Sequence, residues 1–356
     1  MSDNHNEIQR YQIDSEELAE VKKICVIFWG LIGDVLLRVP VLEALKARFP
    51  SSDITVVIDP PARDAIRNHP ACAEVTLFSR NKKPLFKYIY TFGKSVLYLR
   101  KQNFDLCVNL YSGGSSPLIT RLINARIRLG FDHTEALRKA NNLLVKTPSF
   151  CGNWTKAIGT TLEPLGVSVD AIRRGSTFCV STEARQFASE FLVKKEKHYF
   201  AINLGARVPE KRWPVRKYAE LASRIADQYA IQPVVFANPG MEELSDEFIL
   251  NYVGNRECIR TPLLSLDRVA ALLEKVDFLI TGDTALMHLA FGVKCPTLVL
   301  FTHTRPEVVT PDDCQHIPCF IEDRNLLNEC GLPYGMADIP VEYAWQRFET
   351  LYAQLD

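Results

Sequence analysis

Residues 23–49 read KICVIFWGLIGDVLLRVPVLEALKARF, and the order of their parts predicts the architecture of the whole chain. The first six residues, Lys23 to Phe28, form a largely apolar run that predicts a strand buried on both faces. Gly30 and Gly33 interrupt this run, and from Val35 to Phe49 apolar residues recur at helical spacing. A buried strand, a glycine turn and a helix indicate the start of a doubly wound parallel sheet.

The same alternation continues through the first half of the chain. Short apolar runs of strand length alternate with segments of helical period. The predicted strands are Ile54–Ile58, Glu74–Phe78 and Leu106–Leu110, and the predicted helices are Ala62–Asn68 and Pro84–Lys101. Such alternation indicates a parallel sheet with helices on both faces.

A second series of alternating strands and helices begins near His198. Its predicted strands are Tyr199–Leu204, Pro233–Ala237, Phe278–Thr281 and Thr297–Phe301, and its predicted helices are Val215–Tyr229, Glu242–Asn251, Ser265–Lys275 and Ala285–Phe291. We therefore expect an α/β fold of two Rossmann-like doubly wound domains that face each other across a cleft, with ligands at the carboxyl ends of the strands.

The expected domain boundaries follow from these two series. Residues 1–20 are charged and show no period, so we expect a loose N-terminal extension. Residues 21–180 should form the N-terminal domain and residues 181–340 the C-terminal domain. Residues 341–356 should form a C-terminal helix that can pack back on the N-terminal domain.

Composition narrows the class of protein. The chain has 356 residues, of which 47% are hydrophobic and 24% charged, values typical of a globular protein. Lys+Arg and Asp+Glu both total 42, and this zero net charge argues against nucleic acid as a partner. No apolar window reaches about 18 residues and the first twenty residues lack an apolar core, so we expect a cytoplasmic protein. The ten cysteines are scattered, and we expect most of them to be reduced core residues.

Gly30 to Asp34 occupies the first predicted strand-to-helix turn. Asp34 allows two interpretations, a helix cap or an ionised carboxylate that accepts a proton from a substrate. The turn lacks the third glycine of a dinucleotide-binding loop, and the chain contains no P-loop motif, so neither class of nucleotide enzyme is favoured.

Asn203 to Arg207 opens the second half after its first predicted strand, and Lys211 to Pro214 follows. One interpretation is a solvated basic turn. The other is a cation held beside a diphosphate, with Lys211 as a point charge.

Thr281 to Ala290, TGDTALMHLA, combines an apolar strand end, a Gly-Asp-Thr turn and a helix start. Free backbone amides and hydroxyls at such a position favour anion binding. His288 lies four residues after Thr284, on the same helical face, and is either a ligand contact or a satisfied structural group.

Three motifs together resemble glycosyltransferase family 9, the ADP-heptose:lipopolysaccharide heptosyltransferases. They are GDVLLRVPVLEALK near the N-terminus, NLGAR with KRWPVRKYAEL in the middle, and GDTALMHLAFGVKCPT near the end. The resemblance extends from Lys23 to Leu355 and keeps the order and spacing of all three.

The resemblance implies a GT-B fold and an inverting, metal-independent transfer of heptose from ADP-heptose to a sugar of the lipopolysaccharide inner core. It implies no cofactor and no metal, an acceptor-binding N-terminal domain and a nucleotide-sugar-binding C-terminal domain. Asp34 matches the family's catalytic base and Lys211 the lysine near the donor phosphates. The implied donor-binding residues are Gly205, Ala206, Arg207, Glu242, Leu264, Asp283, Thr284, Ala285 and His288.

This sequence also departs from the family pattern. Ala285 stands where the family often has Gly, and Phe28, Trp29 and Gly30 replace polar residues that often precede the first turn. A family histidine is replaced near Asn153 and Trp154.

Basic and aromatic residues alternate between Arg80 and Lys101. One interpretation is an amphipathic helix that packs its aromatic residues inward. The other is a surface that holds a membrane-rooted, phosphate-bearing acceptor and places the protein peripherally at the inner leaflet of the cytoplasmic membrane. For that role we single out Arg80, Lys82, Lys83 and Lys87.

Four alternatives remain. The chain can be a nucleotide-sugar-binding protein without catalysis, although retention of both Asp34 and Lys211 argues against this. It can be another nucleotide-sugar transferase of GT-B fold, or an epimerase of the UDP-N-acetylglucosamine 2-epimerase type. Separately, Cys314, Cys319 and Cys330, with His316, can form a metal site, although their spacing differs from that of structural zinc sites.

Overall fold

The computed structural model describes residues 13–79, 83–111, 113–147, 152–193, 198–302, 304–312, 315–321 and 334–355. The chain divides into two compact units. The first unit is Met1–Arg173 and the second is Arg174–Asp356, so the boundary falls a few residues before the expected position at 180.

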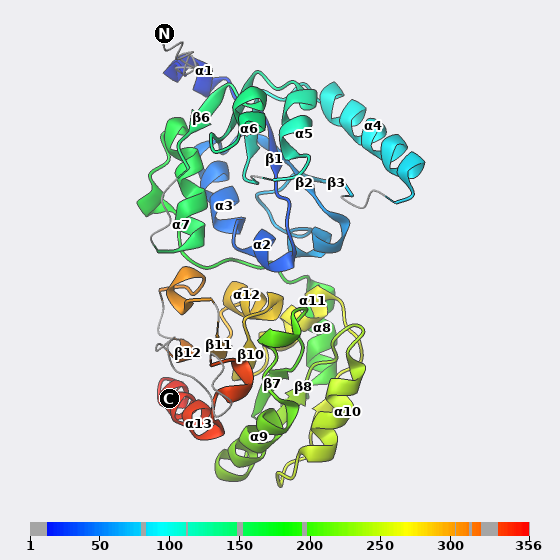
Figure 1. The fold of residues 1–356 in the computed structure, drawn as a ribbon, viewed down its shortest axis with the longest axis vertical. Helices are drawn as coiled ribbons and strands as arrows, with labels where there is room; N and C mark the ends of the chain where they lie inside the picture. The colour runs from blue at the N-terminus through cyan, green and yellow to red at the C-terminus, as the bar shows by residue number, and fades with distance from the viewer. Residues whose placement is uncertain are drawn as a thin grey trace, which may run out of the picture. The chain divides into compact units, whose positions relative to one another are not determined.

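A six-stranded parallel sheet forms the centre of the first unit (Figure 1). Its strands are β1 (Lys23–Ile27), β2 (Asp53–Ile58), β3 (Glu74–Leu77), β4 (Leu106–Asn109), β5 (Ile127–Phe131) and β6 (Leu143–Val145). Their order is β3-β2-β1-β4-β5-β6, and all described pairs are parallel. This is the Rossmann order. Successive strands extend the sheet to one side from β1 to β3 and to the other side from β4 to β6, so the strand order reverses between β1 and β4.

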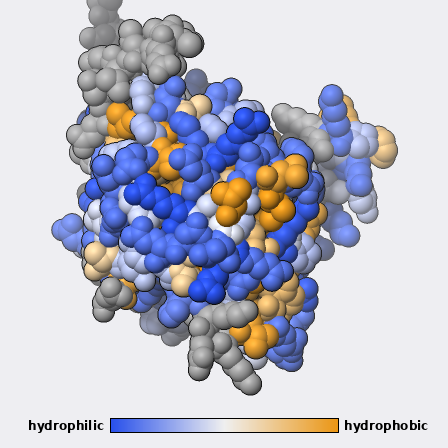
Figure 2. All heavy atoms as spheres, turned by 90° about the horizontal axis from the view of Figure 1, so that it is seen from below, coloured by the Kyte–Doolittle hydropathy of each residue, from blue (hydrophilic) through white to orange (hydrophobic). Residues whose placement is uncertain are grey.

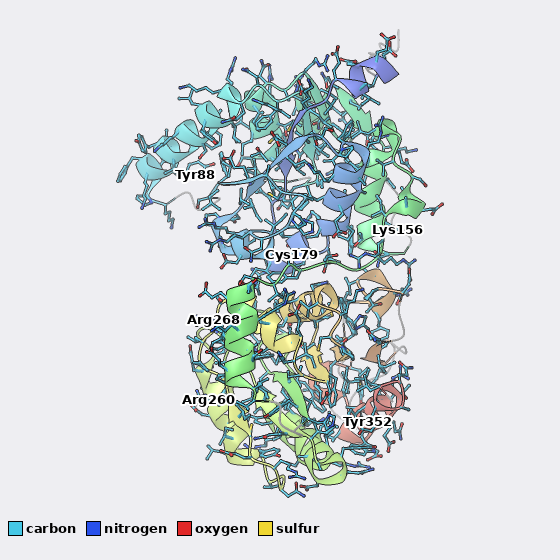
Figure 3. All side chains as sticks on the ribbon, turned by 180° about the vertical axis from the view of Figure 1, so that it is seen from behind. Tyr88, Lys156, Cys179, Arg260, Arg268 and Tyr352 are labelled. Atoms are coloured by element: carbon cyan, nitrogen blue, oxygen red, sulfur yellow. The ribbon has the colours of Figure 1, made fainter. Side chains whose placement is uncertain are left out.

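Helices connect these strands. They are α1 (Ser15–Ala19), α2 (Ile32–Leu36), α3 (Val39–Arg48), η1 (Pro60–Ala65), α4 (Leu85–Lys101), α5 (Ser116–Ile123), α6 (Glu135–Ala140), α7 (Trp154–Gly159), η2 (Thr160–Leu165) and η3 (Val169–Ala171). Lys156 joins α7 to η3, because its ammonium donates to the carbonyl oxygens of Val169 and Asp170 at 2.9 and 3.1 Å (Figure 3).

Three expectations for the first unit were wrong in detail. The predicted helix from Val35 to Phe49 is two helices, because Pro40 has no N–H to donate to the carbonyl of Leu36. The predicted helix at Ala62–Asn68 is the 3₁₀ helix η1, which begins at Pro60. The expected loose extension contains α1, whose Leu18 is buried.

The second unit repeats the strand order of the first. Its strands are β7 (Tyr199–Asn203), β8 (Gln232–Val235), β9 (Ile259–Arg260), β10 (Phe278–Gly282), β11 (Thr297–Phe301) and β12 (His316–Phe320). They lie in the order β12-β11-β10-β7-β8-β9 and all described pairs are parallel. The reversal here falls between β7 and β10, as between β1 and β4 in the first unit.

The helices of the second unit cover this sheet (Figure 1). They are α8 (Thr182–Phe191), η4 (Pro209–Lys211), α9 (Val215–Tyr229), α10 (Glu242–Asn251), α11 (Leu266–Leu273), α12 (Ala285–Gly292), η5 (Pro306–Val308), η6 (Met336–Asp338) and α13 (Val341–Tyr352). Helices α8 and α11 pack together, and the Arg268 guanidinium lies 4.6 Å from the ring centroid of Phe187 (Figure 3).

The C-terminal helix α13 packs within the second unit. Trp345 and Phe348 are buried in the same hydrophobic cluster as Phe200 of β7 and Phe278 of β10. The structure therefore assigns this helix to the second unit, and its expected packing on the N-terminal domain stays a prediction. A helix with four buried apolar residues on one face completes the core of the unit whose last strand precedes it.

Each sheet is buried on both faces, which explains why the strand sequences are continuous apolar runs. On the face shown in Figure 2, hydrophilic side chains predominate and hydrophobic ones gather in separate patches. Among the described helices, none has both the length and the apolar character needed to cross a bilayer.

Candidate functional site

The first candidate site lies where the chain leaves β1 at the reversal point of the first sheet. Asp34 is in the first turn of α2 and is exposed. Its Oδ2 accepts a hydrogen bond from the backbone N–H of Leu31 at 2.9 Å. A side chain at Gly30 would collide with it, because an added Cβ would lie 2.5 Å from the Cβ of Asp34, and Gly30 has a φ of +148°. The glycine therefore permits the close approach of this carboxylate to the turn.

The two interpretations of Asp34 are compatible in this geometry. Leu31, not Asp34, is the residue that caps α2, and Asp34 bonds back to it from the third helical position. One carboxylate oxygen thus stabilises the start of the helix while the side chain stays open to solvent. An exposed carboxylate at the carboxyl end of β1 has the position that a proton acceptor needs. That catalytic role stays a prediction.

Sequence reasoning missed Arg38, which lies one helical turn after Asp34. Its Nη1 donates to the carbonyl oxygen of Asp34 at 2.6 Å and its Nε to the carbonyl oxygen of Leu110 at 3.2 Å. Burial lowers the pKa of Arg38 from its usual value, and the nearby carboxylate of Asp34 opposes this shift. The guanidinium therefore joins helix α2 to the loop after β4. The spacing of four residues was the available signal.

Trp29 lies beneath the same turn and is fully buried. Its ring packs against Phe78 and Tyr111, with centroid distances of 5.6 and 6.2 Å. Among the residues that the structure describes, its indole N–H has no hydrogen-bond partner. Trp29, which stands where the family often has a polar residue, thus places a buried aromatic ring beneath this turn.

The second candidate site lies at the reversal point of the second sheet and is strongly polar. The ammonium of Lys211, from η4, lies 2.5 Å from Oδ2 of Asp283, which follows β10. Thr304 donates its hydroxyl to the same carboxylate oxygen at 2.6 Å. The structure therefore brings together two predicted residues that are far apart in sequence. Thr304 is an additional member that sequence reasoning missed.

Asn203, the last residue of β7, connects the carboxyl ends of β7 and β10. Its Nδ2 donates to Oγ1 of Thr281 at 2.9 Å and to Oγ1 of Thr284 at 3.1 Å. Its Oδ1 is buried and has no partner among the described residues. Gly282 allows a close approach here, because an added Cβ would lie 3.1 Å from the carbonyl oxygen of Lys211. The site therefore offers hydroxyl and amide groups around one ion pair.

Helix α12 begins directly after this polar group, at Ala285. The first amides of an eight-residue helix have no acceptor within the helix and carry partial positive charge. Ala285 is half-buried at this end. His288 is buried one turn further on and its ring packs edge-on against Phe291 at 6.0 Å. The structure supports a packing role for His288, and its contact with donor stays a prediction.

The other predicted donor residues occupy the same carboxyl edge of the second sheet. Gly205 cannot carry a side chain without moving Asn238, whose Cγ would lie 2.5 Å from an added Cβ. Ala206 is buried and its carbonyl accepts from Nε of Arg212 at 2.8 Å, whereas Arg207 is exposed.

Glu242 begins α10 and accepts from the N–H of Gly240 at 3.2 Å, and Leu264 is half-buried between β9 and α11. Their roles stay predictions.

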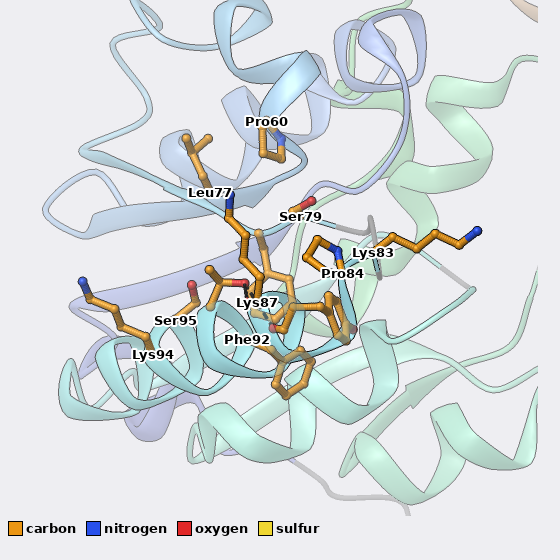
Figure 4. Close-up of a pocket in the computed structure, with 12 residues that line it drawn as sticks. Pro60, Leu77, Ser79, Lys83, Pro84, Lys87, Phe92, Lys94 and Ser95 are labelled. Atoms are coloured by element: carbon orange, nitrogen blue, oxygen red, sulfur yellow. Dashed lines mark hydrogen bonds between the residues drawn. The ribbon is translucent and has the colours of Figure 1, made fainter.

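A basic pocket lies in the first unit between α4 and the carboxyl ends of β2 and β3 (Figure 4). Its volume is about 400 Å³, and its lining includes Lys83, Lys87 and Lys94, with Ser79, Thr91 and Ser95. None of the twelve described lining residues is acidic. Strands lie about 4.8 Å apart, so the pocket is on the order of 10 Å along the sheet edge from β1. Arg80 and Lys82 lie outside the described residues.

The structure separates the two described members of the suggested cysteine site. His316 and Cys319 are three residues apart on β12 and so point to opposite faces of the sheet. Nδ1 of His316 lies 3.0 Å from Oγ1 of Thr297, and Cys319 belongs to the core beside α13. Burial raises the pKa of Cys319 to about 12. These two residues do not share a metal site, and Cys314 and Cys330 lie outside the described residues.

Comparison with known proteins identifies similar chains. Residues 92–324 match the family model of glycosyltransferase family 9 (heptosyltransferase). The lipopolysaccharide core heptosyltransferase OpsX of Haemophilus influenzae is 22% identical over 320 residues, which cover 88% of each chain.

Two solved structures are similar along nearly the whole chain. A glycosyl transferase family 9 protein from Veillonella parvula has a TM-score of 0.83 and 23% identity, and the match covers 94% of this chain and 98% of that one. ADP-heptose lps heptosyltransferase II of E. coli has a TM-score of 0.76 and 21% identity, with coverage of 93% and 99%. These likenesses confirm the expected α/β GT-B fold class with two Rossmann-like units.

Proposed function

Because this chain belongs to glycosyltransferase family 9, the heptosyltransferase family, we propose that it transfers a heptose from ADP-heptose to the inner core of lipopolysaccharide. The reaction that fits the two sites is a single inverting displacement without a metal ion. The second unit binds the donor, and the first unit binds the acceptor and removes its proton.

The observation that carries this proposal is the ion pair at the second reversal point. Lys211 and Asp283 lie 2.5 Å apart beside the first turn of α12. A donor diphosphate at this position meets one ammonium and several helix amides. Negative charge develops on the diphosphate as ADP leaves, and a fixed donor at such a position contributes about 3 kcal/mol to the transition state. These groups supply the charge that a divalent cation supplies in other transferases.

The proposed chemical step forms one bond, breaks one bond and transfers one proton. The acceptor hydroxyl oxygen forms a bond to the anomeric carbon of the heptose while the bond from that carbon to the diphosphate oxygen breaks. The electron pair of the broken bond leaves with ADP, and the hydroxyl proton passes to the carboxylate of Asp34. Attack opposite the leaving group inverts the anomeric centre.

The acceptor side of the proposal rests on the basic pocket. Its lysines, Lys83, Lys87 and Lys94, lie along the same carboxyl edge as Asp34 and suit an anionic group on the acceptor. Lipopolysaccharide precursors carry such groups and are rooted in a membrane. We therefore place the enzyme in the cytoplasm, peripheral to the inner leaflet of the inner membrane.

A donor and acceptor screen tests the function. Purified protein should release ADP from ADP-heptose only when a truncated, heptose-free lipopolysaccharide is present, and the product should gain one heptose of inverted configuration. Release should persist in excess EDTA. Conversion of a UDP-sugar without acceptor would instead support an epimerase, and tight ADP-heptose binding without turnover on any acceptor would support a non-catalytic binding protein.

A further inference from the structure

Helix α4 carries apolar side chains on two faces, and only one of them is covered. Val96 and Leu99 are buried, and Phe92 packs edge-on against Phe78 at 5.0 Å. On the other face Phe86 is 77% exposed and Tyr90 is 69% exposed. The inward packing that the sequence suggested therefore holds for fewer than half of the apolar residues of this helix.

The exposed apolar residues form one continuous stripe. Phe86, Ile89, Tyr90 and Leu97 are all at least 60% exposed, and their spacings of three, four and eleven residues place them on one side of the helix. Gly93 lies in the same row, and an added Cβ there would meet no atom of the described residues within 4 Å. The stripe therefore faces open space along three turns of α4.

Positive charge flanks this stripe. Lys87, Lys94 and Lys101 are spaced by seven residues and so follow one edge of the helix next to the stripe. The helix also contains Arg100 and has no acidic residue, whereas the whole chain has a net charge of zero. The surface is thus apolar in its centre and cationic at its border.

The helix is held firmly enough to present this surface. Its second half is anchored by Val96 and Leu99, and the hydroxyl of Tyr98 donates to Oε1 of Glu74 on β3 at 2.7 Å. The pKa of Tyr98 is raised because its hydroxyl bonds to that carboxylate. Figure 1 shows α4 at the border of the first unit, beyond the strand β3.

The charge pattern decides between possible occupants of the stripe. If α4 paired with α4 of a second copy about a twofold axis, each row of cations would face an identical row, which is unfavourable. An anionic lipid surface offers hydrocarbon to the stripe and phosphate to the lysines, whose long stems reach the headgroups. Aromatic rings such as those of Phe86 and Tyr90 favour the interfacial layer between the hydrocarbon and the headgroup phosphates.

We propose that α4 is an interfacial membrane helix that lies flat on an anionic bilayer, with its exposed stripe inserted and its lysines on lipid phosphates. This inference rests on the proposed function, which requires a membrane-rooted acceptor. It adds the surface that meets the lipid. It also explains why the basic pocket lies beside the same helix, since Lys87 and Lys94 line that pocket (Figure 4).

Flotation with vesicles tests the proposal. The full chain should bind vesicles of phosphatidylglycerol and phosphatidylcholine about tenfold or more better than vesicles of phosphatidylcholine alone. The triple variant Phe86→Ser, Ile89→Ser, Leu97→Ser should lose about tenfold or more of this binding. Its three sites are exposed, so circular dichroism and the melting temperature should match the parent.

A matched control uses exposed apolar residues of the second unit. Leu250, Val253 and Leu263 are 84%, 83% and 53% exposed, and their replacement by Ser should leave flotation unchanged. The variant Lys94→Glu, Lys101→Glu should bind anionic vesicles less tightly than the parent, and its vesicle binding should depend less on salt concentration. Brominated lipids should quench the added tryptophan fluorescence of the variant Phe86→Trp.

Two outcomes would overturn the proposal. One is equal flotation by the Ser triple variant and the parent. The other is concentration-dependent dimerisation that the triple variant abolishes, which would make the stripe an interface between copies. Transfer to a soluble, delipidated acceptor is measured separately and should be unchanged in the triple variant. Absence of transfer by the parent, with flotation intact, would refute the proposed function and leave the membrane helix standing.

Discussion

The reversal points of the two sheets share one strand order and differ in chemistry. In the first unit the turn after β1 holds one exposed carboxylate, Asp34, above the buried ring of Trp29. In the second unit the turns after β7 and β10 hold an ion pair, Lys211 with Asp283, surrounded by hydroxyl and amide groups. The topology therefore sets the place of each site, and the loop residues set what it can bind.

The difference divides the proposed reaction between the units. A single carboxylate can accept one proton and offers nothing to a diphosphate. A cation beside helix amides suits a diphosphate and is a poor general base. If this division holds, a substitution in one turn should change one kinetic quantity and leave the other nearly unchanged.

The largest effect should come from Asp34→Asn. The amide oxygen can still accept the N–H of Leu31, so the turn keeps its hydrogen bond while the base is lost. Turnover should fall by about 100-fold or more, as is typical when a general base is removed. Calorimetry should show unchanged ADP affinity. Near-normal turnover in Asp34→Asn, with only Asp34→Ala impaired and less stable, would reduce Asp34 to a structural role.

Lys211→Ala should give the opposite pattern. Loss of the ammonium removes a contact to phosphate before and during the reaction, so ADP affinity should fall and kcat/KM should fall by about 100-fold. Arg216→Ala is a suitable control, because Arg216 is an exposed cation in the first turn of α9. Equal ADP binding by the Lys211 variant and the parent would end the assignment of this residue to the donor.

Charge reversal in the basic pocket should affect a third quantity. The double variant Lys83→Glu, Lys87→Glu should raise the KM for the acceptor by about tenfold, because its anionic group would then meet carboxylates. ADP affinity should not change. The double reversal Lys22→Glu, Lys139→Glu, at exposed positions of the same unit, should leave the acceptor KM as it is. If both double variants raise it equally, the effect is one of general charge.

Thr304→Val should have the smallest effect and sharpen the picture of the donor site. It removes the hydroxyl that donates to Asp283 at 2.6 Å while keeping the side-chain shape. A hydrogen bond to a charged group contributes about 1.5–3 kcal/mol, and part of it is replaced by water, so donor KM should rise about threefold to tenfold. Thr304→Ser should restore the parental value. A Val variant without any change in donor KM would leave Thr304 out of the site.

The fold was largely predictable because the central strands are long apolar runs. The runs at β1, β7 and β10 required no knowledge of distant residues. Four strands were missed. β6 and β9 are short, with three and two residues, whereas β5 and β12 have five residues each but contain Arg and Gly or His and Pro among their apolar residues. A few apolar residues carry too little periodic signal to separate a strand from a loop.

The candidate site was predictable only in part. The motifs pointed to Lys211 and Asp283, which the structure places in contact, but Thr304 donates to Asp283 from 21 residues away in sequence. For α4, periodicity revealed an amphipathic helix, yet both faces contain apolar residues. Which of the two faces is covered depends on packing against α5 and Phe78, and that is set by tertiary structure.

The position of α13 has a consequence for synthesis of the chain. This last helix belongs to the core of the second unit, and every strand of the first sheet lies within residues 23–145. No strand of the first sheet therefore comes from the C-terminal part of the chain. At about 5–20 residues per second, the ribosome needs on the order of 10–40 seconds more to make the second unit. The first unit can therefore fold while the rest is still being translated. Stalled nascent chains should yield a protease-resistant N-terminal fragment, and its absence would show that the first unit needs the second.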